Sequence, residues 1–316
     1  MWNRYRRKIQ MSEERLEPID LNVEETEIPV EEPKKKKSNI GSTLLIIVGL
    51  ICMAISISGL YGIYKEYKEA EDIYNEAEEN FVQYEPGNEA VTEIGSELGT
   101  ELETEIAPPP VPWYQLASVD LVGLKQSYPD IVGWIFFEDG LISYPVVQGE
   151  DNDQYLHTTY NGKESKSGSI FVDAAHSGDF TDTHTIIYGH NMKNLSMFGR
   201  LKHYKTQGGY YAEHQYFQIF CGDEILRYQI FAYRDVEVDN IVYQETFTSG
   251  RKLSYELLRR SYINPKLKIE DDDRIITLST CTADDAHRFI VSAVLVERYN
   301  IVDGTLTVEL EKTVEE

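Results

Sequence analysis

Residues 274–281 read Arg-Ile-Ile-Thr-Leu-Ser-Thr-Cys, and this stretch decides the expected fold. The apolar and β-branched residues at 275–278 predict a buried strand that carries Cys281 to its end. A second apolar run, 289–296, follows a short polar turn and begins next to Arg288. The two runs predict a hairpin that brings a thiol and a guanidinium to the same end.

A third apolar run delivers a histidine in the same way. Residues 185–188 read Thr-Ile-Ile-Tyr and lead through Gly189 to His190. A cysteine, a histidine and an arginine at three strand ends are the components of a site for cysteine acyl transfer. The thiolate would attack a carbonyl, the imidazole would protonate the leaving amine, and the guanidinium would stabilise the tetrahedral oxyanion.

Each of these residues also has a less specific interpretation. An apolar-flanked cysteine is usually a core residue, and a bridge between Cys281 and Cys221 is possible from the sequence and would remove the thiol. His287 competes with His190 because it is adjacent to Arg288. Neighbouring side chains of a strand point to opposite faces, so His287 would face away if Arg288 faces the site. The residues alone therefore give His190 only a slight preference.

The charge of the chain is strongly negative and unevenly distributed. Its 316 residues have a formal net charge of -24, which argues against nucleic acid as a partner. Residues 65–112 carry fourteen acidic side chains against Lys65 and Lys68, so half of the excess lies in that segment.

A membrane span is expected close to the N-terminus. Residues 40–64 contain no charged side chain, and about 20 apolar residues suffice for a helix to cross a bilayer. Four lysines at 34–37 precede this run, so we expect the N-terminus to be cytoplasmic and the rest of the chain to be outside. A cleaved signal peptide is the alternative, but the preceding tail is long and the run has no small-x-small exit.

The domain organisation follows from these features and from the prolines at 108–110 and 112. We expect a cytoplasmic tail, one transmembrane helix, a stalk that is first helical and then Pro-rich, and a folded extracellular catalytic domain, over residues 1–39, 40–64, 65–112 and 113–316. The helix at 65–83 would continue the membrane helix, and the stalk would hold the domain away from the bilayer.

Short strands dominate the expected catalytic domain. Helices are predicted at 118–128, 195–201 and 253–262. Strands are predicted at 131–136, 144–148, 169–172, 185–188, 216–220 and 226–233, followed by the two runs described above and ending near residue 308. This pattern predicts a mostly β fold, closed or nearly closed into a barrel of about eight strands.

The combination of motifs resembles the sortases, and specifically class B. The resemblance rests on Thr-Leu-Ser-Thr-Cys at 277–281, on Arg288 at the start of an apolar strand, and on Tyr-Gly-His-Asn-Met at 188–192. It spans roughly residues 113–312 and includes further stretches at 132–135, 144–149 and 168–173. It implies a sortase-like barrel with an N-terminal helical lead-in and a helix between the sixth and seventh strands, here 253–262.

The resemblance also implies roles for particular residues. Cys281 would be the nucleophile, His190 the acid and base, and Arg288 the group that holds the oxyanion and clamps the substrate. Three candidate substrate-binding residues accompany them: Thr280 beside the oxyanion, Ser279 and Tyr188. No cofactor and no metal is implied, because calcium dependence belongs to class A; the acidic run 270–273 could mimic a cation site, but a solvated loop is favoured.

The implied function is that of a membrane-anchored enzyme on the outer face of a Gram-positive-type cell. It would cleave the C-terminal sorting signal of a secreted protein after Thr, in a motif of the Asn-Pro-x-Thr-x kind, and transfer that protein to an amine of a peptidoglycan precursor. Two alternatives stay open. One is a pilin polymerase that uses a lysine of another protein as acceptor, and the other is an anchored ectodomain that only binds.

Overall fold

The computed structural model describes residues 40–85, 111–244, 246–281 and 286–310, with the backbone alone at 40–42 and at Cys281. The chain divides into two compact units, residues 1–55 and 56–316. The expected tail, the Pro-rich part of the stalk and the turn after Cys281 fall almost wholly outside the described residues.

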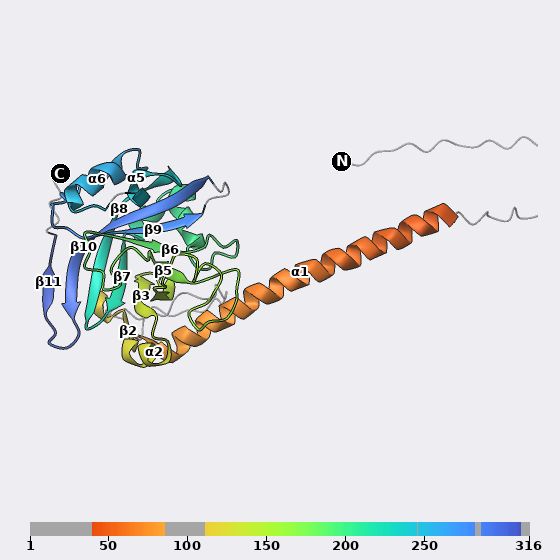
Figure 1. The fold of residues 1–316 in the computed structure, drawn as a ribbon, viewed down its shortest axis with the longest axis horizontal. Coiled ribbons are helices and arrows are strands. Elements are labelled where there is room, and N and C mark those ends of the chain that lie inside the picture. The colour runs from red at the N-terminus through yellow and green to blue at the C-terminus, as the bar shows by residue number, and fades with distance from the viewer. Residues whose placement is uncertain (1–39, 86–110, 245, 282–285, 311–316) are drawn as a thin grey trace, which may run out of the picture. The chain divides into compact units, whose positions relative to one another are not determined.

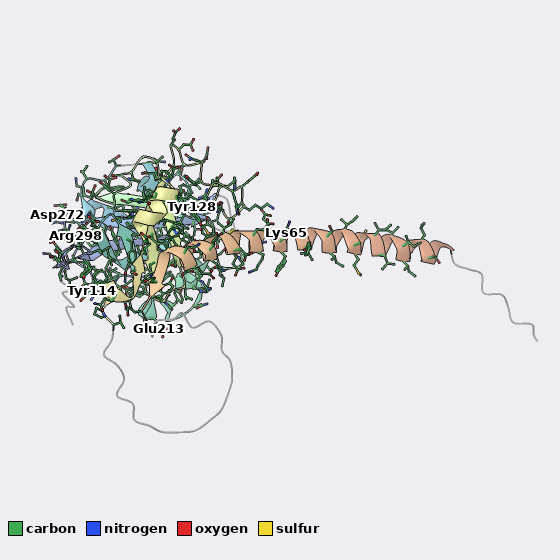
Figure 2. The ribbon with its side chains drawn as sticks, turned by 90° about the horizontal axis from the view of Figure 1, so that it is seen from below. Lys65, Tyr114, Tyr128, Glu213, Asp272 and Arg298 are labelled. Carbon is green, nitrogen blue, oxygen red and sulfur yellow. The ribbon has the colours of Figure 1, made fainter. Side chains whose placement is uncertain are left out.

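The first element is the helix α1 (Ile40–Phe81), which joins the apolar run and the following charged run without a break. Figure 2 labels Lys65, where the charged part of this helix begins. Large apolar side chains from Leu44 to Tyr64 are exposed in the protein. Within the described part of the chain, α1 is the one helix long and apolar enough to cross a membrane.

Eight strands form a closed barrel (Figure 1). Their hydrogen-bonded order is β10-β8-β7-β3-β4-β5-β6-β9, and pairing of β9 with β10 closes the ring. The pairs β4–β5 and β6–β9 are parallel, and the others are antiparallel. The strands are β3 (Ile131–Phe137), β4 (Ser143–Val147), β5 (Ile170–Val172), β6 (His184–Tyr188), β7 (Tyr216–Cys221), β8 (Glu224–Glu237), β9 (Ile275–Cys281) and β10 (His287–Asn300). The prediction of a closed barrel of about eight strands is confirmed.

Three short strands lie outside this ring. β11 (Leu306–Val308) pairs with the outer side of β10. β1 (Val82–Tyr84) and β2 (Ala117–Val119) form a separate antiparallel pair.

The helices around the barrel are short. They are η1 (Trp113–Gln115), α2 (Leu121–Ser127), η2 (Gly199–Lys202), α3 (His203–Thr206), α4 (Tyr210–Glu213), α5 (Ile241–Gln244) and α6 (Gly250–Leu258). The helix α6 lies between β8 and β9, the sixth and seventh strands of the barrel, as expected. Its N-cap is Ser249, whose side chain accepts from Lys252 N, and Arg260, just after the helix, has a φ of +63°.

The predicted helix at 195–201 is wrong. Leu195 and Met197 both have positive φ, which a right-handed helix excludes. The side chain of Asn194 accepts from Ser196 N and Ser196 Oγ, a local turn that competes with helical hydrogen bonds. Helical structure begins only at Gly199.

The strands β9 and β10 are covered on both faces. One face packs into the main core with Ile276, Leu278 and Val291. The other contributes Ile275 and Ile290 to a second cluster, which includes Leu253 and Leu257 of α6. Burial on two faces explains why these strands have continuous apolar runs in place of alternating polar residues.

The main core also takes up the end of α1. Ile73, Tyr74 and Ala77 are buried in it, together with Val82 of β1. The packed fold therefore begins well before Trp113, the start that we expected from the sequence. These positions are three and four residues apart, which is the spacing of one helical face, so the acidic residues of the same helix can remain in solvent.

Candidate active site

The strand register brings the three candidate catalytic residues to one end of the barrel. Cys281 and Arg288 are direct cross-strand partners at the end of the β9–β10 hairpin. On the other side of β9, Tyr188 of β6 lies beside Ser279, and Gly189 N donates to Ser279 O at 3.1 Å. His190 follows directly, so it leaves β6 next to the end of β9.

A pocket of about 200 Å³ opens at this end. Each candidate residue with a described side chain contributes to its wall, and so do two residues that sequence reasoning missed, Asn152 and Leu156. The lining residues are Asn152, Leu156, Phe171, Tyr188, Gly189, His190, Ser279, Thr280 and Arg288. No linear motif identifies Asn152 or Leu156, because both lie in the long connection between β4 and β5.

The ring of His190 is fixed by a backbone carbonyl. Its Nε2 lies 2.7 Å from Leu156 O, and since a carbonyl can only accept, Nε2 carries a proton. The Nδ1 atom is then the nitrogen at which a proton can be exchanged with a substrate.

The surroundings of His190 favour the neutral ring. Burial lowers the pKa of His190 below its ordinary value, and the hydrogen bond to Leu156 O opposes this effect. The ring of His157 stacks on His190, with centroids 5.8 Å apart, and also lowers its pKa. A lower pKa makes the protonated ring a stronger acid, which favours the donation of its proton to a leaving group.

The guanidinium of Arg288 contributes to the pocket wall and donates from Nη1 to His287 O at 2.9 Å. Burial and Asp173 raise the pKa of Tyr188, and the positive charge of Arg288 opposes this rise. The competing His287 pairs with Glu237 of β8 in the register and does not line this pocket. Of these two histidines, His190 is the one that lines the pocket.

Aromatic rings form one wall of the site. The ring of Tyr188 lies 5.3 Å from Phe171 and 6.5 Å from Tyr243, and its hydroxyl donates to Asp173 Oδ2 at 2.9 Å. The hydroxyl of Tyr243, from α5, lies 2.8 Å from Ser279 Oγ. No motif selects Tyr243, because it lies in the four-residue helix α5 between two strands.

Thr280 offers a buried hydroxyl to the pocket. Its side chain is 3% exposed, and its Oγ1 has no hydrogen-bond partner among the described residues. A buried polar atom of this kind is usually paired with a ligand or with water. Thr280 therefore stays a candidate substrate-binding residue in the wall of this pocket.

Two alternative interpretations of the sequence can be examined in the structure. Cys221 is a buried free thiol, and burial raises its pKa to about 12, so the proposed bridge to Cys281 is excluded. In the acidic run, Glu270 is paired with Arg251 and Lys268, and Asp273 accepts from Glu270 N.

Comparison with known proteins identifies the family. A family model described as the sortase domain matches residues 138–296. Sortase B of Listeria monocytogenes is 34% identical over 185 residues, which cover 57% of this chain and 75% of that protein.

Solved structures of similar proteins give the same result. Sortase B of Clostridium perfringens matches with a TM-score of 0.51 and 32% identity, over 55% of this chain and 98% of that one. A substrate complex of Staphylococcus aureus sortase B matches with a TM-score of 0.51 and 28% identity, over 55% of this chain and 83% of that one. A Streptococcus pyogenes class B sortase involved in pilus biogenesis matches with a TM-score of 0.51 and 27% identity, over 56% of this chain and 98% of that one. The chain therefore belongs to the sortase family of cysteine transpeptidases, and the relatives it resembles are class B sortases.

Proposed function

We propose that this protein is a membrane-anchored sortase that cleaves a C-terminal sorting signal after Thr and transfers the protein to an amine of a cell wall precursor. The catalytic residues would be Cys281, His190 and Arg288. The enzyme would cross the membrane once through the apolar part of α1, with its N-terminus in the cytoplasm.

The observation that carries this proposal is the register around the end of β9. Arg288 lies directly across from Cys281, and Gly189, bonded to Ser279, leads to His190 on the other side. A carbonyl bound there would be within reach of groups for nucleophilic attack, proton transfer and charge stabilisation, which acyl transfer to a thiol requires.

The acylation step follows from these positions. The Cys281 thiolate adds to the carbonyl carbon of Thr, and the oxyanion that forms is stabilised by the Arg288 guanidinium and the Thr280 hydroxyl. When the C–N bond breaks, the protonated His190 ring gives its Nδ1 proton to the leaving amine. The products are a thioester on Cys281, a neutral imidazole and a free amine.

The second step is the reverse with a different amine. The incoming amine attacks the thioester carbonyl and loses a proton to His190. The C–S bond breaks, so that a new amide forms and the thiolate and imidazolium are restored. The lowered pKa of His190 helps it to release its proton in the first step.

The proposal is tested with the full chain in detergent micelles and a peptide library of the Asn-Pro-x-Thr-x kind. We expect cleavage after Thr and an acyl adduct on Cys281 that mass spectrometry detects. Cys281→Ala should abolish both, and the matched variant Cys221→Ala should retain them. Cleavage by the Cys281 variant, or an adduct at another residue, would refute the assignment.

A second candidate function is pilin polymerisation. The similarity to the S. pyogenes class B sortase involved in pilus biogenesis supports it. The same thioester would then be resolved by a lysine of another protein. Competition between a lysine-bearing pilin-like peptide and a short peptidoglycan-type amine in the transfer assay distinguishes the two acceptors.

The non-catalytic alternative predicts that the thiol is dispensable. A thiol-selective alkylator should modify Cys281 before Cys221, because burial keeps the Cys221 thiol protonated. A binding module would keep its function after this treatment, and a sortase would lose it.

A further inference from the structure

We infer that the helix α1, which continues the apolar run, positions His190 through the connection between β4 and β5, with Tyr74 and Gly168 as the positioning residues. The inference rests on the proposed function of His190. It is argued from a continuous series of contacts between α1 and the imidazole.

The first contact joins α1 to the end of this connection. The buried hydroxyl of Tyr74 donates to Gly168 O and lies 3.4 Å from Ser169 Oγ. In return, the hydroxyl of Tyr160 donates to Ile73 O at 3.3 Å. These hydrogen bonds link residues about 90 positions apart in the chain, so α1 and the connection are held together by tertiary structure alone.

A surface contact extends this attachment. Lys166 Nζ, from the same connection, pairs with Glu66 of α1 at 2.7 Å. The Tyr74 ring also lies 5.7 Å from Tyr160. Residues 160–169 therefore meet α1 along more than two helical turns, from Glu66 to Tyr74.

The second contact joins the two ends of the connection to each other. Gly168 has φ +52°, and a Cβ atom there would lie 2.3 Å from Leu156 O and 2.8 Å from Tyr155 O. Ser169 N donates to Tyr155 O at 3.0 Å, and Ser169 Oγ donates to Thr158 O at 2.7 Å. The backbone that Tyr74 holds is thus packed directly against the backbone of Leu156.

The third contact reaches the imidazole. Leu156 O accepts from His190 Nε2 at 2.7 Å, and this hydrogen bond fixes both the ring orientation and the tautomer. The titratable groups that face His190 from the described elements are His157 of the same connection, Tyr188 of β6 and Arg288 of β10. Among these described elements, only the connection forms a hydrogen bond with the ring of His190. The position of the connection therefore determines the position of Nδ1.

Other contacts also hold the connection, which limits the expected effect. Tyr155 OH donates to Asp130 Oδ2 at 2.6 Å, and Ala174 N donates to Asn152 Oδ1 at 2.8 Å. Loss of the Tyr74 hydroxyl should therefore displace the carbonyl of Leu156 without unfolding the connection. A displacement well below 1 Å is sufficient to reduce catalysis, since a 1 Å error can cost about a hundredfold in rate.

The test compares Tyr74→Phe with Tyr84→Phe in the full chain in lipid nanodiscs. Tyr84 hydrogen-bonds Glu78 and Ser143 at the same junction of α1 with the barrel, but it does not contact the connection. The measurements are the NMR titration of the His190 ring, the amide exchange of Ser169, and kcat/KM for a sorting peptide.

We expect Tyr74→Phe to lower kcat/KM about tenfold, to lower the pKa of His190 further, and to speed exchange of the Ser169 amide. Tyr84→Phe should change none of the three beyond its general loss of stability. Gly168→Ala should reproduce the Tyr74→Phe effects more strongly, because its Cβ would push Leu156 O away. Equal effects of Tyr74→Phe and Tyr84→Phe, or an unchanged His190 titration in Gly168→Ala, would overturn the inference.

The two NMR measurements can be repeated in a Cys281→Ala background, so they do not depend on activity. If the His190 titration responds to Tyr74→Phe but kcat/KM does not, the coupling exists and the proposed role of His190 is wrong. If kcat/KM falls and the ring is undisturbed, the role of His190 stands and the inference fails.

Discussion

Arg288 is the residue whose position is most closely determined by the register. It begins β10 directly opposite Cys281, and its Nη1 is bonded to the backbone carbonyl of His287. A guanidinium donates in a rigid planar fork, so one edge can be fixed by the protein while another is directed at a ligand. An ammonium group cannot divide its donors in this way.

Arg288→Lys should therefore lower kcat by about a hundredfold, because the charge remains but the fork is lost. Single-turnover cleavage of a sorting peptide measures the effect. Arg298→Lys is the matched control: it lies near the other end of β10, where Arg298 pairs with Glu309 on the surface, and it should leave kcat unchanged. Near-normal turnover of Arg288→Lys would show that backbone groups stabilise the oxyanion.

His184 illustrates a different role for a histidine. Its Nε2 lies 3.0 Å from Thr277 Oγ1, its Nδ1 has no hydrogen-bond partner among the described residues, and burial lowers its pKa to about 3. The unfolded chain binds a proton near pH 6.5 and the folded state resists it. The folded state is therefore favoured fully by the neutral His184 ring above about pH 6.5. The free energy of unfolding then decreases as the pH falls from 6.5 toward 3, because the unfolded chain takes up the proton.

We expect His184→Leu to reduce the loss of stability on acidification. His184 should account for a decrease of about 2 kcal/mol in the free energy of unfolding when the pH is lowered from 6.5 to 5, and the variant should lack this decrease. Urea unfolding at both pH values, compared with the original chain, isolates this difference. Parallel curves for the two proteins would show that His184 is not the group responsible.

Cys281, Arg288 and His190 each terminate or begin an apolar run, and the structure brings the ends of these runs together. The hairpin of the last two runs was expected from the sequence, whereas the choice of His190 rested on the resemblance to the family, and the roles of all three residues stay predictions. Leu156 and Tyr243 could not be selected in this way. Leu156 acts through its backbone carbonyl, and Tyr243 is brought to Ser279 by a connection that carries no periodic signal.

At the scale of elements, the strands were predicted best and α1 least completely. The strands have long apolar runs because both faces of β9 and β10 are buried. The charge density of residues 65–81 suggested a solvated stalk, but the spacing of Ile73, Tyr74 and Ala77 places a single apolar stripe against the barrel. A net charge averaged over a segment conceals such a stripe.

A chain that begins at residue 113 should consequently be less stable than one that begins at residue 65. It lacks the buried side chains of Ile73, Tyr74 and Val82 and the pairing of β1 with β2. Burial of one large apolar side chain contributes about 1.5–3 kcal/mol, so we expect a loss of at least 3 kcal/mol in the free energy of unfolding. Urea titration of both chains measures it. Equal stabilities would mean that the end of α1 packs only loosely.

The whole molecule combines one helix able to cross a membrane with a barrel whose pocket lies at a strand end. The helix α1 carries both the apolar run and the Tyr74 contacts. The direction in which the apolar run inserts into a membrane decides on which side of that membrane the barrel lies.

The four lysines at 34–37 should set that direction, because basic residues next to a membrane helix remain in the cytoplasm. Their replacement by Gln should give a mixed population in which part of the barrel faces inward. Protease digestion of intact cells measures the outward fraction, and we expect it to fall while the activity of detergent-solubilised protein stays unchanged. Mutation of the paired surface residues Lys65 and Glu69 on the other side of the apolar run is the control and should leave the orientation intact. Uniform outward orientation in the Gln variant would show that other features of the chain determine its topology.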